Sequence, residues 1–231
     1  MSVSFLKNPI ILALDVDDQK TAFDHLKTLG HLVGAVKLGP RLVYRYGSEF
    51  VKECAKTCPV FVDNKYFDIP STMVAAVQAS FDSGATLVTA HALSGSEALK
   101  QLSDLEKKLN QIRPFKILAV TILTSWDEKS FPPSFKVLPV QDHVVALANL
   151  VIESGLDGIV CSGHELNLLK NKNLYKVVPG IRFTSSADSN HDQKRVMSPK
   201  EALSAGAQAL VIGRVLLQSK NPEKDIQDIL N

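Results

Sequence analysis

Eight short apolar runs, separated by amphipathic stretches, constrain the fold of this chain more than any other feature. The runs are rich in branched residues, as the buried strands of a parallel sheet are. They cover residues 9–15, 32–39, 59–65, 85–91, 115–123, 156–162, 175–180 and 207–213. Helical patterns lie between them at residues 17–30, 71–84, 95–110, 141–155 and 198–207. This alternation predicts a parallel sheet joined by right-handed crossovers.

Eight strand-helix units in 231 residues fit an α/β fold of one kind, a closed (β/α)8 TIM barrel. A doubly wound sheet usually carries a glycine-rich turn after its first strand, and residues 12–20, LALDVDDQK, contain no such turn. We find no internal linker, so we expect residues 1–231 to form a single domain. The two longest irregular segments, 124–138 and 180–197, each follow a strand and are predicted to be lids or binding loops.

The composition, 45% hydrophobic and 22% charged residues, predicts an ordinary soluble globular protein. The chain has 26 basic and 24 acidic residues, a formal net charge of +2, which gives no bulk reason to expect nucleic acid or a membrane surface. The N-terminal residues resemble neither a secretory signal nor a membrane anchor, so we expect a cytoplasmic protein. Cys54, Cys58 and Cys161 are an odd number and are interpreted as reduced thiols.

Charged residues recur where the predicted strands end. Barrel enzymes place their chemistry at the C-terminal ends of the strands. The residues near these ends are Asp15, Lys37, Asp63, Lys65, His91, Arg182 and Arg214. Each has an ordinary alternative role: Asp15 could begin a helix cap, Lys37 could extend its ammonium from the rim, and Arg214 could be solvated. Lys37 and Asp63, however, stand among residues suited to burial, where a charge needs a partner.

The stretch FVDNKYFDIPST, residues 61–72, concentrates this charge. Asp63 and Lys65 are two apart on a strand, so both are predicted to point into the mouth of the barrel. Asp68 has left the strand and could instead cap the helix that Pro70 opens.

Other polar and aromatic residues give weaker signals. His91 is interpreted as a structural group, and His164 as the start of a helix. Trp126 could cover a ligand or pack on the barrel rim, and packing is preferred. No zinc-protease motif and no G-x-S-x-G elbow occurs.

The spacing D-x-K-x-x-D followed by IPST resembles the signature of the orotidine 5'-phosphate decarboxylase family. The likeness runs along the whole chain in order, through LALDV, VKLGP, DNKYFDIPST, VTAHALSG, LAVTILTS, GLDGIVCSGHE, VVPGIR, DQKRVMSP and ALVIGR. Departures from the common pattern are Asn64 for Leu, Tyr66 and Phe67 for Phe or Leu then His, and Ser71 for Asn or Thr.

The resemblance implies decarboxylation of orotidine 5'-phosphate (OMP) to UMP and CO2, the last step of de novo pyrimidine biosynthesis, without cofactor or metal. Lys65 would protonate C6, and Lys37, Asp63 and Asp68 would complete a charged array. Asp68, Ile69 and Thr72 would act across a homodimer interface. The full set of implied substrate-binding residues is Asp15, Lys37, Asp63, Ile69, Thr72, Thr124, Arg182, Gln193, Gly213 and Arg214.

The resemblance also implies which part of the substrate each of these residues would bind. Asp15, Lys37 and Thr72 would bind ribose hydroxyls, and Thr124 would read the pyrimidine amide edge. The phosphate would meet Gln193, Gly213 and Arg214, with Arg182 supporting the loop or the phosphate. Whether Asp63 also repels the substrate carboxylate stays open.

Two rival functions remain at this stage. A sugar-phosphate decarboxylase or hexulose-phosphate synthase shares the D-x-K-x-x-D motif, but it uses Mg2+ and usually carries an acidic residue near the end of strand two, where this chain has Lys37. A silent barrel that only binds nucleotides or partners is the other rival. Buried charges are costly to keep without use, which argues against it.

Overall fold

The eight predicted strands form a closed parallel barrel in which each strand pairs with its neighbour in the chain and β8 returns to β1. The computed structural model describes residues 5–126, 129, 131–135, 138–181 and 197–230. The strands are β1 (Ile10–Ala13), β2 (Ala35–Leu38), β3 (Val60–Tyr66), β4 (Ala85–His91), β5 (Lys116–Val120), β6 (Gly158–Val160), β7 (Tyr175–Val178) and β8 (Ala209–Ile212). The (β/α)8 prediction is confirmed.

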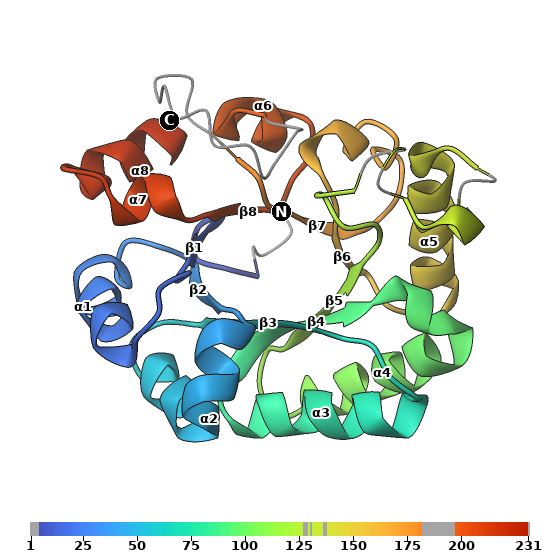
Figure 1. Ribbon diagram of the computed structural model, residues 1–231, viewed down its shortest axis with the longest axis horizontal. Coiled ribbons are helices and arrows are strands. Elements are labelled where there is room, and N and C mark those ends of the chain that lie inside the picture. The colour runs from blue at the N-terminus through green and yellow to red at the C-terminus, as the bar shows by residue number, and fades with distance from the viewer. Residues whose placement is uncertain (1–4, 127–128, 130, 136–137, 182–196, 231) are drawn as a thin grey trace.

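Helices lie outside the ring of strands (Figure 1). They are α1 (Gln19–Leu29), α2 (Pro40–Ala55), α3 (Pro70–Asp82), α4 (Gly95–Leu109), α5 (Val140–Glu153), α6 (Pro199–Ser204), α7 (Arg214–Leu217) and α8 (Pro222–Leu230). Short 3-10 helices are η1 (Ala92–Ser94), η2 (Pro133–Phe135) and η3 (Gly163–Glu165). The sequence patterns predicted five of the α-helices, and α2, α7 and α8 are additions.

Two apolar layers hold the barrel together. Inside the ring, a small cluster is formed by alternate strand residues, among them Ile11, Ala13, Ala35, Phe61, Leu87, Leu118, Val177 and Val211. The intervening strand residues pack outward against the helices in a larger cluster. Strands with apolar side chains on both faces are what a helix-covered parallel sheet requires.

The inward-facing series continues into polar residues at the C-terminal end of four strands. Two residues beyond Ala13, Ala35, Phe61 and Leu87 stand Asp15, Lys37, Asp63 and Thr89. Because side chains alternate along a strand, these four continue the interior row toward the mouth of the barrel. The fold therefore gathers residues from four strands at one end of the barrel.

Several smaller predictions can be compared with the structure. Cys54, Cys58 and Cys161 are free and buried, and burial raises the pKa of Cys54 to about 12 and that of Cys58 to about 11. His164 lies in η3, as predicted for a helix start. In the part of the chain that the structure describes, no helix has the length and apolar character needed to cross a bilayer.

Candidate active site

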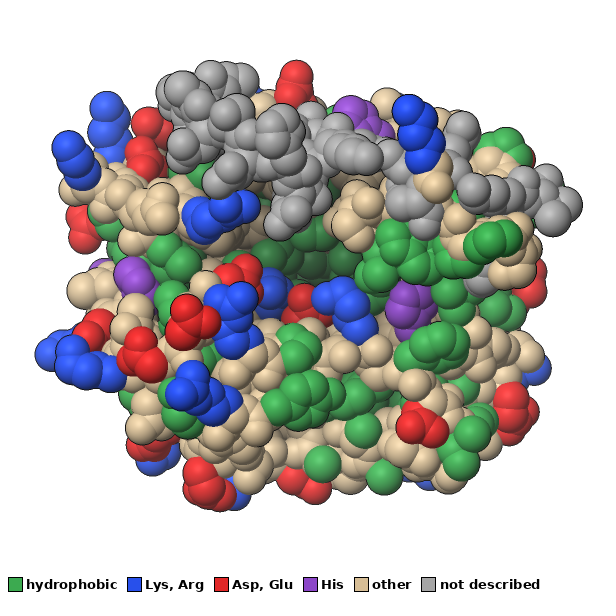
Figure 2. Space-filling view, viewed as in Figure 1, with side chains coloured by type: hydrophobic (Ala, Val, Ile, Leu, Met, Phe, Trp, Pro, Cys, Tyr) green, Lys and Arg blue, Asp and Glu red, His purple; other side chains and the backbone are tan. Residues whose placement is uncertain are grey.

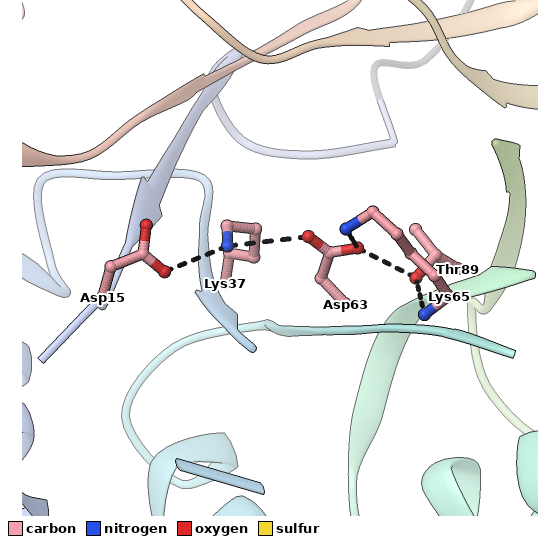
Figure 3. A network of polar contacts seen from close by, with 5 residues as sticks. All are labelled: Asp15, Lys37, Asp63, Lys65 and Thr89. Atoms are coloured by element: carbon pink, nitrogen blue, oxygen red, sulfur yellow. Dashed lines mark hydrogen bonds and ion pairs between the residues drawn. The ribbon is translucent and has the colours of Figure 1, made fainter. Parts of the chain in front are cut away.

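A continuous row of alternating charges occupies the mouth of the barrel (Figure 3). Lys37 Nζ lies 3.2 Å from Asp15 Oδ1 and 3.6 Å from Asp63 Oδ2. Lys65 Nζ donates a hydrogen bond of 2.9 Å to Asp63 Oδ1. The order carboxylate, ammonium, carboxylate, ammonium places opposite charges side by side throughout. The structure thus brings together Asp15, Lys37, Asp63 and Lys65, which the sequence placed on three separate strand ends.

Burial makes the centre of this row electrostatically strong. The side chains of Lys37 and Asp63 are 12% and 13% exposed, whereas that of Lys65 is 39% exposed. Burial alone would raise the pKa of Asp63, but the charges of Lys37 and Lys65, with hydrogen bonds from Lys65 and Thr89, hold that pKa below its usual value. Asp63 is therefore a carboxylate at neutral pH.

The main chain of β3 is irregular around Lys65. Val62 of β3 pairs with Val88 of β4, and the next pairing joins Tyr66 to Ala90. Three residues, 63 to 65, therefore stand opposite the single residue Thr89, which makes a bulge in β3. Lys65 has a φ of 50°, the left-handed region, and is the one non-glycine residue with positive φ in the described part of the chain.

Thr89 is a member of the site that the sequence interpretation missed. Its hydroxyl is fully buried, accepts the backbone N–H of Lys65 at 2.8 Å and donates to Asp63 Oδ1 at 3.0 Å. Its position two residues after Leu87 and two before His91 marks it as an inward-facing polar residue in an apolar strand. That alternation is the signal that could have found it.

Asp68 does not join the row within this chain. Its carboxylate is exposed and accepts the backbone N–H of Ile69 at 2.7 Å. The suggestion that Asp68 caps α3 is wrong, since the N-cap is Ile69 and no side chain caps it. Asp15 likewise caps no helix, because α1 is capped by Asp18. Ile69 and Thr72 are exposed beside Asp68.

Three of the residues assigned to the rest of the substrate follow the C-terminal ends of strands, Thr124 after β5 and Gly213 and Arg214 after β8. Gly213 precedes α7 and lies close to Asp15. A Cβ built on Gly213 would be 3.9 Å from Asp15 Oδ2. Arg214 is exposed at the first position of α7, and Thr124 is partly buried after β5. Arg182 and Gln193, with most of segment 180–197, lie outside the described residues.

His91 and Trp126, which the sequence predicts to be structural or packing residues, both lie against an aromatic ring. His91 Nδ1 accepts the N–H of Leu93 at 3.5 Å, and its ring lies 5.5 Å from that of Phe67. Burial lowers the pKa of His91, and the charge of Lys65 lowers it further, so the ring is neutral at pH 7. Trp126 packs edge-on against Phe131 at 5.5 Å, in agreement with the packing interpretation.

The space-filling view shows where charged and apolar side chains gather on one face of the molecule (Figure 2). Basic and acidic side chains gather in a hollow at the centre of the face, and apolar side chains occupy the lip below it. Within the described residues, no three His, Cys, Asp or Glu side chains are grouped so that they could hold a metal ion.

A closed (β/α)8 barrel with a row of alternating carboxylates and ammoniums at its strand ends, largely buried at Lys37 and Asp63, has the architecture of a barrel enzyme. Residues 8–229 match a sequence model described as the orotidine 5'-phosphate decarboxylase / HUMPS family. The chain belongs to this family.

Individual relatives cover nearly the whole chain. It is 38% identical over 224 residues to an orotidine 5'-phosphate decarboxylase of Pseudoalteromonas translucida, spanning 95% of this chain and 94% of the relative. It is 39% identical over 230 residues to one of Erythrobacter litoralis, spanning 97% and 98%. A crystal structure of the Lactobacillus acidophilus orotidine 5'-phosphate decarboxylase superposes with a TM-score of 0.82 at 31% identity, covering 97% of this chain and 98% of that one.

Proposed function

We propose that this chain decarboxylates OMP to UMP and CO2, and that Lys65 supplies the proton that replaces the carboxylate at C6. The observation that carries the proposal is the row Lys37, Asp63, Lys65 at the barrel mouth, with Lys65 Nζ held 2.9 Å from Asp63. Family membership and the names of the relatives agree with this reaction.

The chemistry requires a cation at one place. When the bond from C6 to the carboxylate breaks, CO2 leaves and the electron pair stays on C6, where no carbonyl is positioned to delocalise it. An ammonium fixed in a water-poor site stabilises this localised charge more strongly than one in bulk water. Lys65 then transfers a proton to C6 and is reprotonated from solvent. Asp63, which accepts a hydrogen bond of 2.9 Å from Lys65 Nζ, keeps that ammonium in place.

The remaining substrate groups are assigned by the resemblance. Asp15, Lys37 and Thr72 would hold ribose hydroxyls, and Thr124 the pyrimidine edge. Arg214 and the backbone of Gly213, with Gln193 and Arg182, would serve the phosphate. Arg214 is exposed at the first position of α7, directly after β8, and barrel enzymes commonly bind phosphate after strands seven and eight, which supports this assignment.

The active unit is proposed to be a homodimer in which Asp68, Ile69 and Thr72 complete the partner's site. These three residues are exposed in the isolated chain, and Ile69 is 64% exposed beside Phe67 at 61%. Large apolar side chains exposed next to a charged opening are typical of a surface that another molecule covers. We place this enzyme in the cytoplasm, where its free cysteines stay reduced.

One alternative has the same family description. The sugar-phosphate enzymes considered above need Mg2+ and usually an acidic residue near the end of strand two. Here β2 ends in Lys37 and Leu38, and Lys37 is committed to two carboxylates. This feature favours the OMP reaction.

The direct assay follows the absorbance of OMP with purified protein in excess EDTA. We expect complete conversion to UMP at a rate that added Mg2+ does not change. Absence of turnover would contradict the proposed function and favour a silent barrel. A rate abolished by EDTA and restored by Mg2+ would contradict metal-free chemistry.

A further inference from the structure

We propose that Thr89, together with a hydrogen-bonded chain Asn64, Tyr66 and Ser80, positions Lys65 by holding the bulge of β3 from both sides. This inference rests on the proposed function for its kinetic test, and on geometry alone for its second test. None of these four residues is assumed to touch the substrate, so all four are positioning residues.

The bulge needs support because its conformation is unfavourable. A residue with a Cβ is uphill in the left-handed region, and Lys65 occupies that region at φ 50°. The bulge also removes the regular pairing between residues 63–65 of β3 and Thr89 of β4. Without other contacts, residues 63–65 would relax toward a regular strand and carry the Lys65 side chain with them.

Thr89 supplies the contact on the barrel side (Figure 3). Its hydroxyl accepts the N–H of Lys65, which replaces a hydrogen bond of the interrupted ladder, and donates to the Asp63 oxygen that also receives Lys65 Nζ. One buried hydroxyl therefore fixes the main chain of Lys65 and the carboxylate that holds its ammonium. Thr89 is fully buried, so water does not compete for these bonds.

A second contact lies on the opposite side, between β3 and α3. Asn64 Nδ2 donates to Tyr66 Oη at 3.1 Å, and Tyr66 Oη lies 2.7 Å from Ser80 Oγ. Ser80 Oγ donates to the carbonyl of Ala76 at 3.0 Å, so Tyr66 must donate to Ser80 and accept from Asn64. These hydrogen bonds link Asn64 and Tyr66, the residues on either side of Lys65, to the backbone of α3.

The polar residues of this hydrogen-bonded chain are unusual for their position between β3 and α3. Asn64 Oδ1 is buried with no hydrogen-bond partner, a cost that an apolar residue would avoid. Asn64 and Tyr66 also stand at two of the places where the D-x-K-x-x-D segment departs from the common pattern, both with polar groups for apolar ones. A directional link to α3 gives these polar groups a purpose.

The test compares Thr89→Val, which keeps the shape but removes the hydroxyl, with Thr89→Ser, which keeps the hydroxyl. We expect Thr89→Val to lower kcat about 10- to 100-fold with KM within about threefold, since small displacements of a reacting group have effects of this size. Thr89→Ser should stay within about threefold of the parent. Tyr66→Phe, which cuts the outer chain, should lower kcat about 3- to 10-fold. Rates are expressed per mole of folded protein.

The control is Thr121→Val, since Thr121 is as buried as Thr89 but donates to a backbone carbonyl, that of Val160. It should keep the parent kcat. If Thr89→Val keeps kcat within twofold of the parent, or if Thr89→Ser loses as much as Thr89→Val, the positioning role is overturned. Parent kcat in Tyr66→Phe would overturn the outer support.

A second readout needs no substrate. Amine-selective labelling followed by mass spectrometry compares Lys65 with the exposed Lys20 in the same sample. Release of Lys65 from Asp63 in Thr89→Val should raise the labelling of Lys65 relative to Lys20 at least about threefold, and Thr89→Ser should not. A parent inactive on OMP would contradict the proposed function, whereas unchanged labelling in Thr89→Val would contradict the positioning of Lys65.

Discussion

At the scale of single residues, the site depends on a lysine that is held by its neighbours rather than by regular strand geometry. The sequence predicts that Asp63 and Lys65 face the same opening because they are two apart on a strand. They do meet, at 2.9 Å, but through a bulge with Lys65 in the left-handed region. Alternation along a strand predicts the direction of Asp63, and it does not predict the bulge that directs Lys65.

The same limit explains why Thr89 was missed. Threonine is an ordinary strand residue, so the alternation in VTAHAL can place the Thr89 side chain inward but cannot show that its hydroxyl supports a site. Its role arises only when the bulge leaves the N–H of Lys65 without a strand partner. Lys37 and Asp63 were easier to predict because a charge inside an apolar run already requires a partner.

The phosphate assignment of Arg214 is tested by Arg214→Ala. With OMP we expect kcat/KM to fall about 100-fold, since a charge-assisted contact to phosphate is worth about 3 kcal/mol. With orotidine, which lacks the phosphate, the variant and the parent should react at equal rates. The exposed Lys224 of α8, changed to Ala, serves as control and should behave as the parent with both substrates. Equal losses with OMP and orotidine would remove the phosphate assignment.

At the scale of elements, the strands and helices that the sequence predicted are those with a clear local hydrophobic pattern. All eight strands were predicted because each is a compact apolar run. Helix α2 was not, because Gly47 interrupts it with a φ of 71° and breaks the helical pattern in two. Helices α7 and α8 are short, and their amphipathic pattern covers few turns, so packing rather than periodicity defines them.

One contact between elements predicts how stability changes with pH. Glu106 of α4 accepts the backbone N–H of Ile117 in β5, and its burial raises its pKa to about 7, although this hydrogen bond and Lys116 partly offset the effect. The folded state therefore binds a proton between about pH 4.5 and pH 7 that the unfolded state releases. The free energy of unfolding should decline as pH rises through this range, by about 3 kcal/mol from this group.

Glu106→Gln keeps an acceptor for Ile117 and cannot ionise. Chemical denaturation at a series of pH values between 4.5 and 8 should show that this variant lacks the decline and is more stable than the parent at pH 8. The exposed Glu153 on α5, changed to Gln, should follow the parent. A Glu106→Gln variant with the parent's pH dependence would contradict a raised pKa.

At the scale of the whole molecule, the barrel alone does not complete the proposed charged array. Asp15, Lys37, Asp63 and Lys65 meet within one chain, whereas Asp68 is exposed and pairs only with the backbone beside it in the described structure. A contribution from a partner subunit is a property that alternation and burial in one chain cannot predict. The family resemblance alone implies that Asp68 acts across a subunit interface.

Mixing two inactive variants tests this arrangement. Lys65→Ala and Asp68→Asn should each be nearly inactive, but a hybrid dimer has one site with Lys65 from one subunit and Asp68 from the other. Equal amounts, unfolded and refolded together, should recover about one quarter of the parent activity, since about half of the dimers are hybrids and half of their sites are intact. No recovery in a sample shown to contain hybrid dimers would contradict the shared site.

We propose that the ammonium of Lys65 carries the chemistry, and the steady-state kinetics of Lys65→Ala decide whether it does. The variant should bind the product UMP within about tenfold of the parent, because the proposed ribose and phosphate contacts remain. Its kcat on OMP should fall by at least about 1000-fold, through loss of both charge stabilisation and proton donation. The exposed Lys20, paired with Asp24 on α1 and changed to Ala, should leave kcat unchanged. A Lys65→Ala enzyme that folds, binds UMP and decarboxylates OMP at close to the parent rate would show that the Lys65 ammonium does not carry the chemistry.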